Sequence, residues 1–167
     1  MMAQGRFSGK HVFIFGGNSG IGLAAAEGFA DEGAALSLTG RSRETLDEAA
    51  EKTGALALQS DMADPKASAQ AIDAAVKKNG PIDVLFVNAG VGGFAPIGEV
   101  TEDFWDSVHN VNLKGAFFAG QAALPHLREG GAVIFTGSVG SMLALPGNAV
   151  YAAAKAGLRA MARTAET

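Results

Sequence analysis

Short apolar segments alternate with longer segments of helical periodicity along almost the whole chain. The apolar runs end in glycine or polar residues and are typical of strands buried on both faces of a sheet. We expect strands at 11–15, 35–39, 55–59, 82–87 and 132–136. The segments between them repeat apolar residues as one face of a helix does. Strands that alternate with helices predict βαβ units and a parallel sheet.

The helical segments begin and end at residues that commonly bound helices. We expect helices at 20–32, 43–52, 65–78, 101–126 and 150–165. Asp64 is a suitable N-cap for the third of them, and Pro65 suits its first position. The fourth helix is long and contains Asn112 and Pro125. We therefore expect it to be kinked or adjusted near these two residues.

Composition and charge narrow the class of protein. The chain has 167 residues, of which 48% are hydrophobic and 18% charged, so we expect one globular domain spanning 1–167. Its net charge of −4 and its lack of a basic patch give no support for binding to nucleic acid or anionic membranes. Cysteine is absent, which excludes disulfides and thiolate metal sites, and we expect no metal. No apolar stretch approaches the ~20 residues that span a bilayer. Without a signal-peptide pattern at the N-terminus, we expect a cytoplasmic protein.

A glycine-rich loop, G-G-N-S-G-I-G, directly follows the first predicted strand. Glycines let the backbone turn sharply, and the N-terminus of the next helix offers free N–H groups to a pyrophosphate. A tight packing turn without a ligand is the alternative, but the strand–loop–helix context favours dinucleotide binding. The residues expected to contact the cofactor here are Gly16, Asn18, Ser19, Gly20, Ile21 and Gly22.

The end of the second strand bears on which dinucleotide binds. An acidic residue there would accept hydrogen bonds from the adenosine ribose. This chain has Gly40 followed by Arg41, which removes a negative charge and offers a guanidinium to a 2′-phosphate. We therefore expect NADP, with NAD as the alternative. Arg41 as a solvated surface residue, or one that stacks on adenine, is the other interpretation.

Three residues near the C-terminus could form an acid/base site. Tyr151 and Lys155 are four positions apart, so on a helix they share a face. A neighbouring ammonium favours the phenolate form of tyrosine, which suits a proton-transfer catalyst. Ser138 can supply a hydroxyl to hold a substrate oxygen. Alternatively, Tyr151 packs as an aromatic residue, Lys155 is solvated and Ser138 caps a turn.

Taken in order, these motifs resemble the short-chain dehydrogenase/reductase family. The resemblance is carried by G-G-N-S-G-I-G, the Asp61 of S-D-M, V-N-A-G at 87–90, V-N-L-K-G around Asn112, Ser138 and Y-A-A-A-K. It covers nearly the whole chain. One minor departure is Phe15, which stands where the family usually has threonine.

The resemblance implies a Rossmann-type α/β fold: a doubly wound parallel sheet in a three-layer αβα arrangement, here C-terminally short and without the last strands. It implies that Asp61 and Met62 flank the adenine, and that Asn88, Ala89 and Gly90 lie along the cofactor. It also implies that Asn112 holds a water that links Lys155 to solvent.

The resemblance further implies an oxidoreductase that interconverts a carbonyl and a secondary alcohol by hydride transfer. Ser138 and Tyr151 would hold the substrate oxygen, with Tyr151 as general acid/base, while Lys155 and Tyr151 also contact the cofactor. Asn112 completes the expected catalytic set. Because the family's C-terminal substrate loop is missing, a dinucleotide-binding protein or a fragment without turnover is the alternative.

Expectations about substrate and assembly are less specific. Phe94, Met142, Leu143 and Leu145 suggest an apolar substrate pocket. The helices at 104–126 and 150–165 could form a homodimer or homotetramer, as their counterparts do in the family. We expect His109 and His126 on helix surfaces, and Trp105 packed on the sheet or on a neighbouring subunit.

Overall fold

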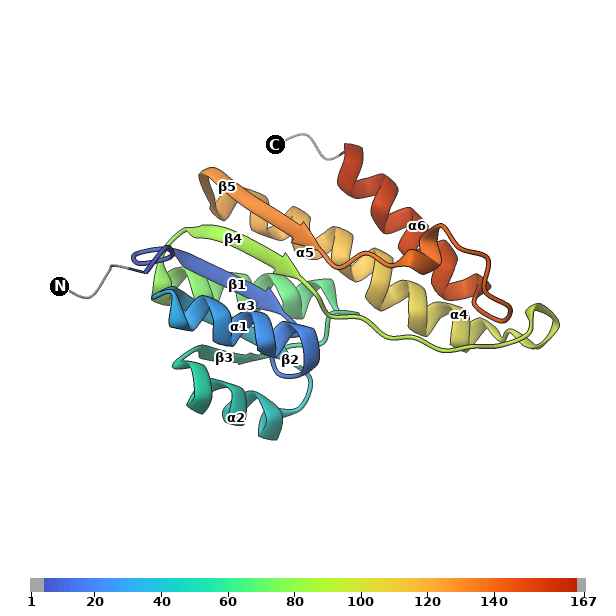
Figure 1. Cartoon of the computed structure of the whole chain (residues 1–167), viewed down its shortest axis with the longest axis horizontal. Helices are drawn as coiled ribbons and strands as arrows, with labels where there is room; N and C mark the ends of the chain where they lie inside the picture. The colour runs from blue at the N-terminus through green and yellow to red at the C-terminus, as the bar shows by residue number, and fades with distance from the viewer. Residues whose placement is uncertain (1–4, 165–167) are drawn as a thin grey trace.

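A computed structural model describes residues 5–164 and shows a parallel sheet with the strand order β3-β2-β1-β4-β5 (Figure 1). The strands are β1 (His11–Phe15), β2 (Ala35–Gly40), β3 (Leu56–Gln59), β4 (Ile82–Val87) and β5 (Leu127–Phe135). The α-helices are α1 (Gly20–Asp31), α2 (Arg43–Thr53), α3 (Pro65–Asn79), α4 (Glu102–His109), α5 (Ala116–Ala123) and α6 (Ala149–Thr164). The predicted Rossmann-type fold is confirmed.

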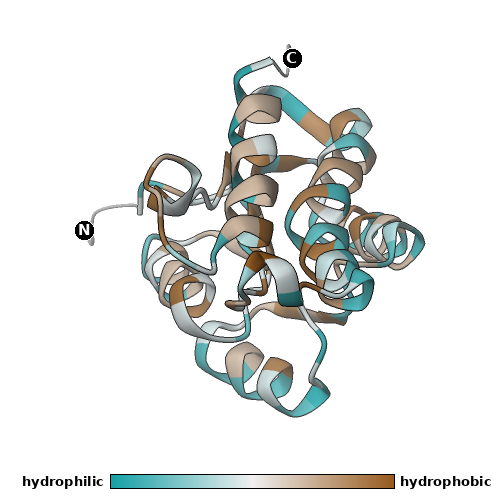
Figure 2. Ribbon diagram, turned by 90° about the vertical axis from the view of Figure 1, so that its right-hand side faces the viewer, coloured by the Kyte–Doolittle hydropathy of each residue, from teal (hydrophilic) through white to brown (hydrophobic). Residues whose placement is uncertain are grey.

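Helices cover both faces of the sheet, which makes three layers. Helices α1 and α2 lie in front of the sheet in Figure 1, and α3 and α5 lie behind it. Side chains of β1 alternate between the two cores: Val12 and Ile14 face α1 and α2, whereas Phe13 and Phe15 face α3 and α5. In Figure 2 the hydrophobic colour is concentrated on the strands and inner helix faces. Burial on both faces explains why the strands read as continuous apolar runs.

The strand order creates the crevice in which a ligand could bind. The chain winds outward from β1 through β2 to β3, then crosses to the other side of β1 to form β4 and β5. The connections after β1 and β4 therefore part in opposite directions. Ligands of open α/β sheets bind at this point, beyond the carboxyl ends of the strands.

Two element boundaries differ from the expectation. The helix expected at 101–126 is divided by a π-helical segment, Asn110–Gly115, which confirms the adjustment predicted near Asn112. A short 3₁₀ turn holds Pro125. Strand β5 begins at Leu127 rather than at 132, and an irregularity in its pairing with β4 accommodates the glycines between. It is an edge strand of the sheet, and Ile134 on it is 44% exposed.

Trp105 does not pack on the sheet, and its packing on a neighbouring subunit stays a prediction. Its ring is exposed and stacks on the His109 ring, with the centroids 4.0 Å apart. The ring nitrogen of His126 lies 3.4 Å from the Asp73 carboxylate, at the helix surface. Assembly through 104–126 and 150–165 stays a prediction.

A buried histidine joins three segments at the amino-terminal end of the parallel strands. His11 is 2% exposed, and its ring nitrogens lie 2.8 Å from the Gly80 carbonyl oxygen and 2.9 Å from Ser37 Oγ. Burial lowers the pKa of His11, and the Gly80 carbonyl and the Asp83 carboxylate offset this only in part. The folded state therefore favours the neutral ring.

This pKa shift predicts a loss of stability in mild acid. Above the unfolded pKa of about 6.5 both states hold a neutral ring, and His11 costs nothing. As the pH falls below that value the unfolded state takes up the proton first, so the free energy of unfolding decreases. We expect His11→Gln to show a shallower decrease between pH 7 and pH 5 in urea titrations. His109→Gln is the matched control, and an equal flattening in that variant would contradict the assignment.

Candidate active site

The glycine-rich loop lies between β1 and α1, at the carboxyl edge of the sheet. The N–H groups of Gly20, Ile21 and Gly22 begin α1 and so have no helical partner. Ser19 precedes the helix in extended conformation and forms no side-chain cap bond. A Cβ at Gly22 would lie 2.0 Å from the Gly16 carbonyl oxygen, so only glycine permits this close turn. The loop therefore presents free donors and no side-chain bulk to an anion.

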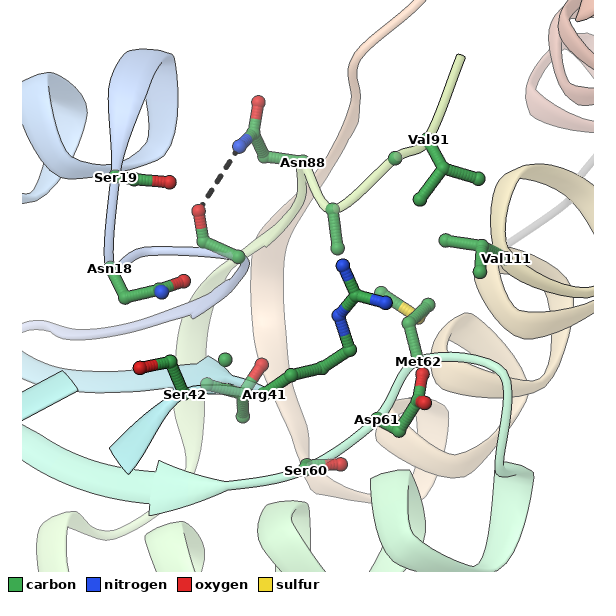
Figure 3. A pocket seen from close by; sticks show the side chains of 15 residues that line it. Asn18, Ser19, Arg41, Ser42, Ser60, Asp61, Met62, Asn88, Val91 and Val111 are labelled. Atoms are coloured by element: carbon green, nitrogen blue, oxygen red, sulfur yellow. Dashed lines mark hydrogen bonds between the residues drawn. The ribbon is translucent and has the colours of Figure 1, made fainter. Parts of the chain in front are cut away.

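A cavity of about 320 Å³ opens beside this loop (Figure 3). Its walls come from the ends of β1, β2, β3 and β4. It is lined by Gly16, Asn18, Ser19, Thr39, Gly40, Arg41, Ser42, Ser60, Asp61, Met62, Asn88, Ala89, Gly90, Val91 and Val111. One carboxylate oxygen of Asp61 accepts the Ala63 N–H at 2.9 Å, which fixes the turn after β3. The cavity brings together most of the residues predicted to hold the adenosine half of a dinucleotide.

The β2 end of this cavity has no room for an acidic side chain. A Cβ at Gly40 would lie 2.4 Å from Asn18 Oδ1, and Asn18 is held in place because its Nδ2 donates to Thr45 Oγ1 at 2.7 Å. Arg41 is exposed, and Figure 3 shows its side chain extending into the cavity. Asn18 therefore occupies the space of the missing carboxylate, and Arg41 supplies a positive charge.

Asn88 connects the glycine loop to the end of β5. Its Nδ2 donates to the Gly16 carbonyl oxygen at 3.1 Å, the bond drawn in Figure 3. Its Oδ1 accepts a hydrogen bond from Thr136 Oγ1 at 2.9 Å. With both ends of the amide engaged, the side chain fixes the floor of the crevice across β1, β4 and β5.

A second cavity, of about 480 Å³, continues the crevice on the far side of Asn88 and Gly90. It holds the three residues of the predicted acid/base site. It is lined by Ile21, Asn88, Gly90, Val91, Gly92, Gly93, Phe94, Thr136, Ser138, Val139, Gly140, Leu145, Asn148, Tyr151 and Lys155. Tyr151 and Lys155 lie one turn apart on α6, and Ser138 reaches the cavity from the loop after β5.

Lys155 is held beside Tyr151 by the backbone of the strand end. It is 3% exposed, and its Nζ donates to the Thr136 carbonyl oxygen at 2.7 Å and lies 5.8 Å from the Tyr151 ring centroid. Burial lowers the pKa of Lys155, because desolvation disfavours the ammonium form. The sequence alternative of a solvated lysine is therefore excluded.

The Ser138 hydroxyl is oriented by its own turn. Its Oγ accepts the Gly140 N–H at 3.1 Å, within a short 3₁₀ turn. With the oxygen accepting this bond, the hydroxyl proton stays available for an acceptor in the cavity. Ser138 therefore both caps the turn and can hold a substrate oxygen.

Comparison with known proteins decides the family. The family model described as short chain dehydrogenase matches residues 10–167. The chain belongs to this family. An oxidoreductase of Sarocladium schorii, asL5, is 38% identical over 168 residues, covering 98% of this chain and 68% of that protein. The cyclic-di-GMP-binding biofilm dispersal mediator protein of Escherichia coli is also 38% identical, over 162 residues, covering 96% and 67%.

A solved structure gives the same result. A short-chain dehydrogenase from Burkholderia cenocepacia in complex with NADP superposes with a TM-score of 0.88 at 34% identity, covering 95% of this chain and 71% of that one. Two other curated relatives are covered over 62–63% of their length, so this chain spans about two thirds of the proteins it matches. Its membership of the short-chain dehydrogenase family identifies the chain as an oxidoreductase.

Within residues 5–164, no group of three His, Cys, Asp or Glu side chains is placed to hold a metal ion. None of the helices in that range combines the length and apolarity needed to cross a bilayer.

Asn112 has a structural role that the sequence did not indicate. It is 1% exposed in the π-helical segment, its Nδ2 donates to the Val91 carbonyl oxygen at 2.6 Å, and its Oδ1 accepts the Val91 N–H at 3.0 Å. This pair of bonds fixes the segment after β4 at Val91, a residue that lines both cavities. The water expected at Asn112 stays a prediction.

Some pocket residues were misplaced by sequence reasoning, and others were missed. Phe94 and Leu145 line the second cavity as expected, but Met142 lines a separate groove between β5 and α6. Thr136 and Asn148 were missed because they lie in no motif. Thr136 stands directly after a strand, and Asn148 stands directly before a helix. These positions were the one signal in the sequence that could have indicated a place in the site.

Proposed function

We propose that this chain binds a nicotinamide dinucleotide along the crevice and reduces a ketone to a secondary alcohol, or catalyses the reverse reaction. The observation that carries the proposal is that the two cavities are adjacent and share Asn88, Gly90 and Val91 in their linings. One holds the glycine loop and Arg41, and the other holds Ser138, Tyr151 and Lys155. A dinucleotide spanning them would bring its nicotinamide to the acid/base residues.

Ser138, Tyr151 and Lys155, which line the second cavity, have distinct parts in this reaction. The bound nicotinamide supplies the hydride that reaches the carbonyl carbon. Ser138 donates a hydrogen bond to the carbonyl oxygen and positions it, while Tyr151 donates the proton that turns this oxygen into a hydroxyl. Lys155 stabilises the resulting phenolate with its charge and returns a proton towards Tyr151.

We infer that NADP is the preferred cofactor. Arg41 extends into the adenosine-side cavity, and Asn18 excludes an acidic side chain from position 40. A guanidinium can pair bidentately with a 2′-phosphate, which NAD lacks.

Arg41→Ala should weaken binding of reduced NADP about tenfold or more, because a charge-assisted pair is lost. Binding of reduced NAD should change by less than about twofold. Fluorescence titration of both cofactors measures the two dissociation constants. Arg43→Ala is the matched control, because Arg43 is already paired with Asp47 on the surface of α2. An equal loss for both cofactors in Arg41→Ala would contradict the phosphate contact.

The activity itself is tested by mixing the chain with reduced NADP and a panel of ketones. The proposal predicts loss of the reduced-nicotinamide absorbance with at least one ketone. Binding of the cofactor without turnover across the panel would contradict it.

That second outcome would instead support a binding protein without turnover. This binding function is favoured by the similarity to the Escherichia coli relative, whose name describes binding of cyclic-di-GMP. Titration with cyclic-di-GMP, alone and in competition with reduced NADP, separates the two functions.

A further inference from the structure

The carboxamide of Asn148 is a buried polar group that the proposed reaction does not use. Asn148 is 5% exposed, and within the described residues its side chain has no hydrogen-bond partner. Within the described residues, the Ser60 and Ser68 hydroxyls also lack a partner, but they are completely sealed from solvent. The Asn148 amide is not completely sealed in this way. Because Asn148 lines the second cavity, its remaining exposure is towards the space a substrate would occupy.

The backbone around Asn148 is rigid. The Asn148 N–H donates to the Leu145 carbonyl oxygen at 3.1 Å, and Pro146 and Gly147 (φ +74°) stand at the two central positions, as in a type II turn. The Gly147 carbonyl oxygen accepts the Ala95 N–H at 2.9 Å, which ties this turn to the opposite wall of the cavity. The backbone that carries the Asn148 side chain is therefore held in a preorganised position.

Helix capping does not explain the residue. Asn148 stands immediately before α6, and its carbonyl oxygen accepts the Ala152 N–H at 2.8 Å. Asparagine in this position usually accepts a helix N–H with its side chain. In the described structure it forms no such bond, unlike Asp64 and Thr101 at the starts of α3 and α4.

The amide lies beside the residues that hold the reacting oxygen. The point where a Cβ of Gly140 would stand is 2.9 Å from Asn148 Nδ2, 3.3 Å from Ser138 Oγ and 3.7 Å from Tyr151 Cδ1. All three side chains thus surround one small volume. A donor so close to Ser138 can reach an oxygen carried on the carbon next to the reacting carbonyl.

We propose that Asn148 is a substrate-specificity residue that donates a hydrogen bond to a second oxygen adjacent to the reacting carbonyl. The substrate class is then an uncharged, largely apolar ketone such as an α-diketone or α-hydroxyketone. This rests on the proposed reductase function and adds the substrate class.

The rest of the cavity supports an uncharged, apolar substrate. Its other wall residues include Ile21, Phe94 and Val139, which are 66%, 73% and 63% exposed. Lys155 is the one charged side chain among the described residues that line it, and its ammonium is bonded to the Thr136 carbonyl oxygen. A carboxylate on the substrate would therefore find no free cation.

The test compares acetylbenzoyl with propiophenone, which differ by a carbonyl in place of a methylene. Calorimetric titration of the chain with each ketone, with and without oxidised NADP, gives dissociation constants that need no turnover. We expect the wild-type chain to bind acetylbenzoyl about tenfold more tightly, as one added hydrogen bond would give. In Asn148→Leu this preference should disappear, so that the two ketones bind with dissociation constants whose ratio is about one.

Asn148→Asp is the matched control for folding. Aspartate has almost the shape of asparagine but no N–H to donate, so an Asn148→Asp chain that its melting temperature shows to be folded should also lose the preference. Equal wild-type affinities, an unchanged ratio in both variants, or no binding of either ketone would overturn the proposal. Failure of the reductase function appears separately, as ketone binding without consumption of reduced NADP.

Discussion

Tyr151→Phe should reduce ketone reduction by about a hundredfold to ten-thousandfold, the range that general acid catalysis contributes. The change removes one oxygen and leaves the ring on α6, where Tyr151 packs beside Val108 and Val150. Lys155 then has no phenol to activate, and the carbonyl oxygen has no proton source. Steady-state decay of the reduced-nicotinamide absorbance measures the loss in kcat.

The melting temperature of Tyr151→Phe should stay close to that of the wild-type chain, because the hydroxyl makes no hydrogen bond within the described structure. A drop in kcat with an intact fold is therefore the expected pattern. Retention of more than about a tenth of the wild-type rate would show that another group delivers the proton.

Asn112→Ala should lower the free energy of unfolding by about 2–4 kcal/mol. It removes both hydrogen bonds to Val91 and leaves the backbone N–H and carbonyl of a half-buried residue without their partners. The π-helical turn, which directs the Asn112 side chain towards Val91, would then no longer be supported by these bonds. Urea denaturation, read by circular dichroism, gives the difference.

Asn110→Ala is the control, because Asn110 lies in the same π-helical segment and has no side-chain hydrogen bond in the described structure. It should cost less than about 1 kcal/mol. Equal costs for the two substitutions would mean that the segment, and not the bonds to Val91, determines the stability.

The parts of the site that are local in sequence could be predicted from it. Tyr151 and Lys155 share a face because four positions make about one helical turn. The glycine loop was recognisable because it stands between a buried strand and a helix. The position of the glycine loop and Arg41 beside one cavity could be predicted because parallel strands place their carboxyl ends at one edge of the sheet.

The parts that depend on contacts between distant segments could not be predicted. Asn112 lies 21 positions from Val91, and Lys155 lies 19 positions from the Thr136 carbonyl that holds it. Nothing in the local sequence specifies either partner. Asn148 is also distant in sequence from the opposite wall at Ala95, so its burial in the cavity appears only in the folded chain.

Hydride transfer is tested most directly with reduced NADP that carries deuterium on the transferring position of the nicotinamide. The chain is incubated with this cofactor and acetylbenzoyl, and the alcohol product is analysed by mass spectrometry and NMR. We predict deuterium on the new carbinol carbon, and formation of this product about a hundredfold to ten-thousandfold more slowly with Tyr151→Phe. A product without deuterium, or no product while the cofactor is bound, would contradict the assignment of the crevice as a hydride-transfer site.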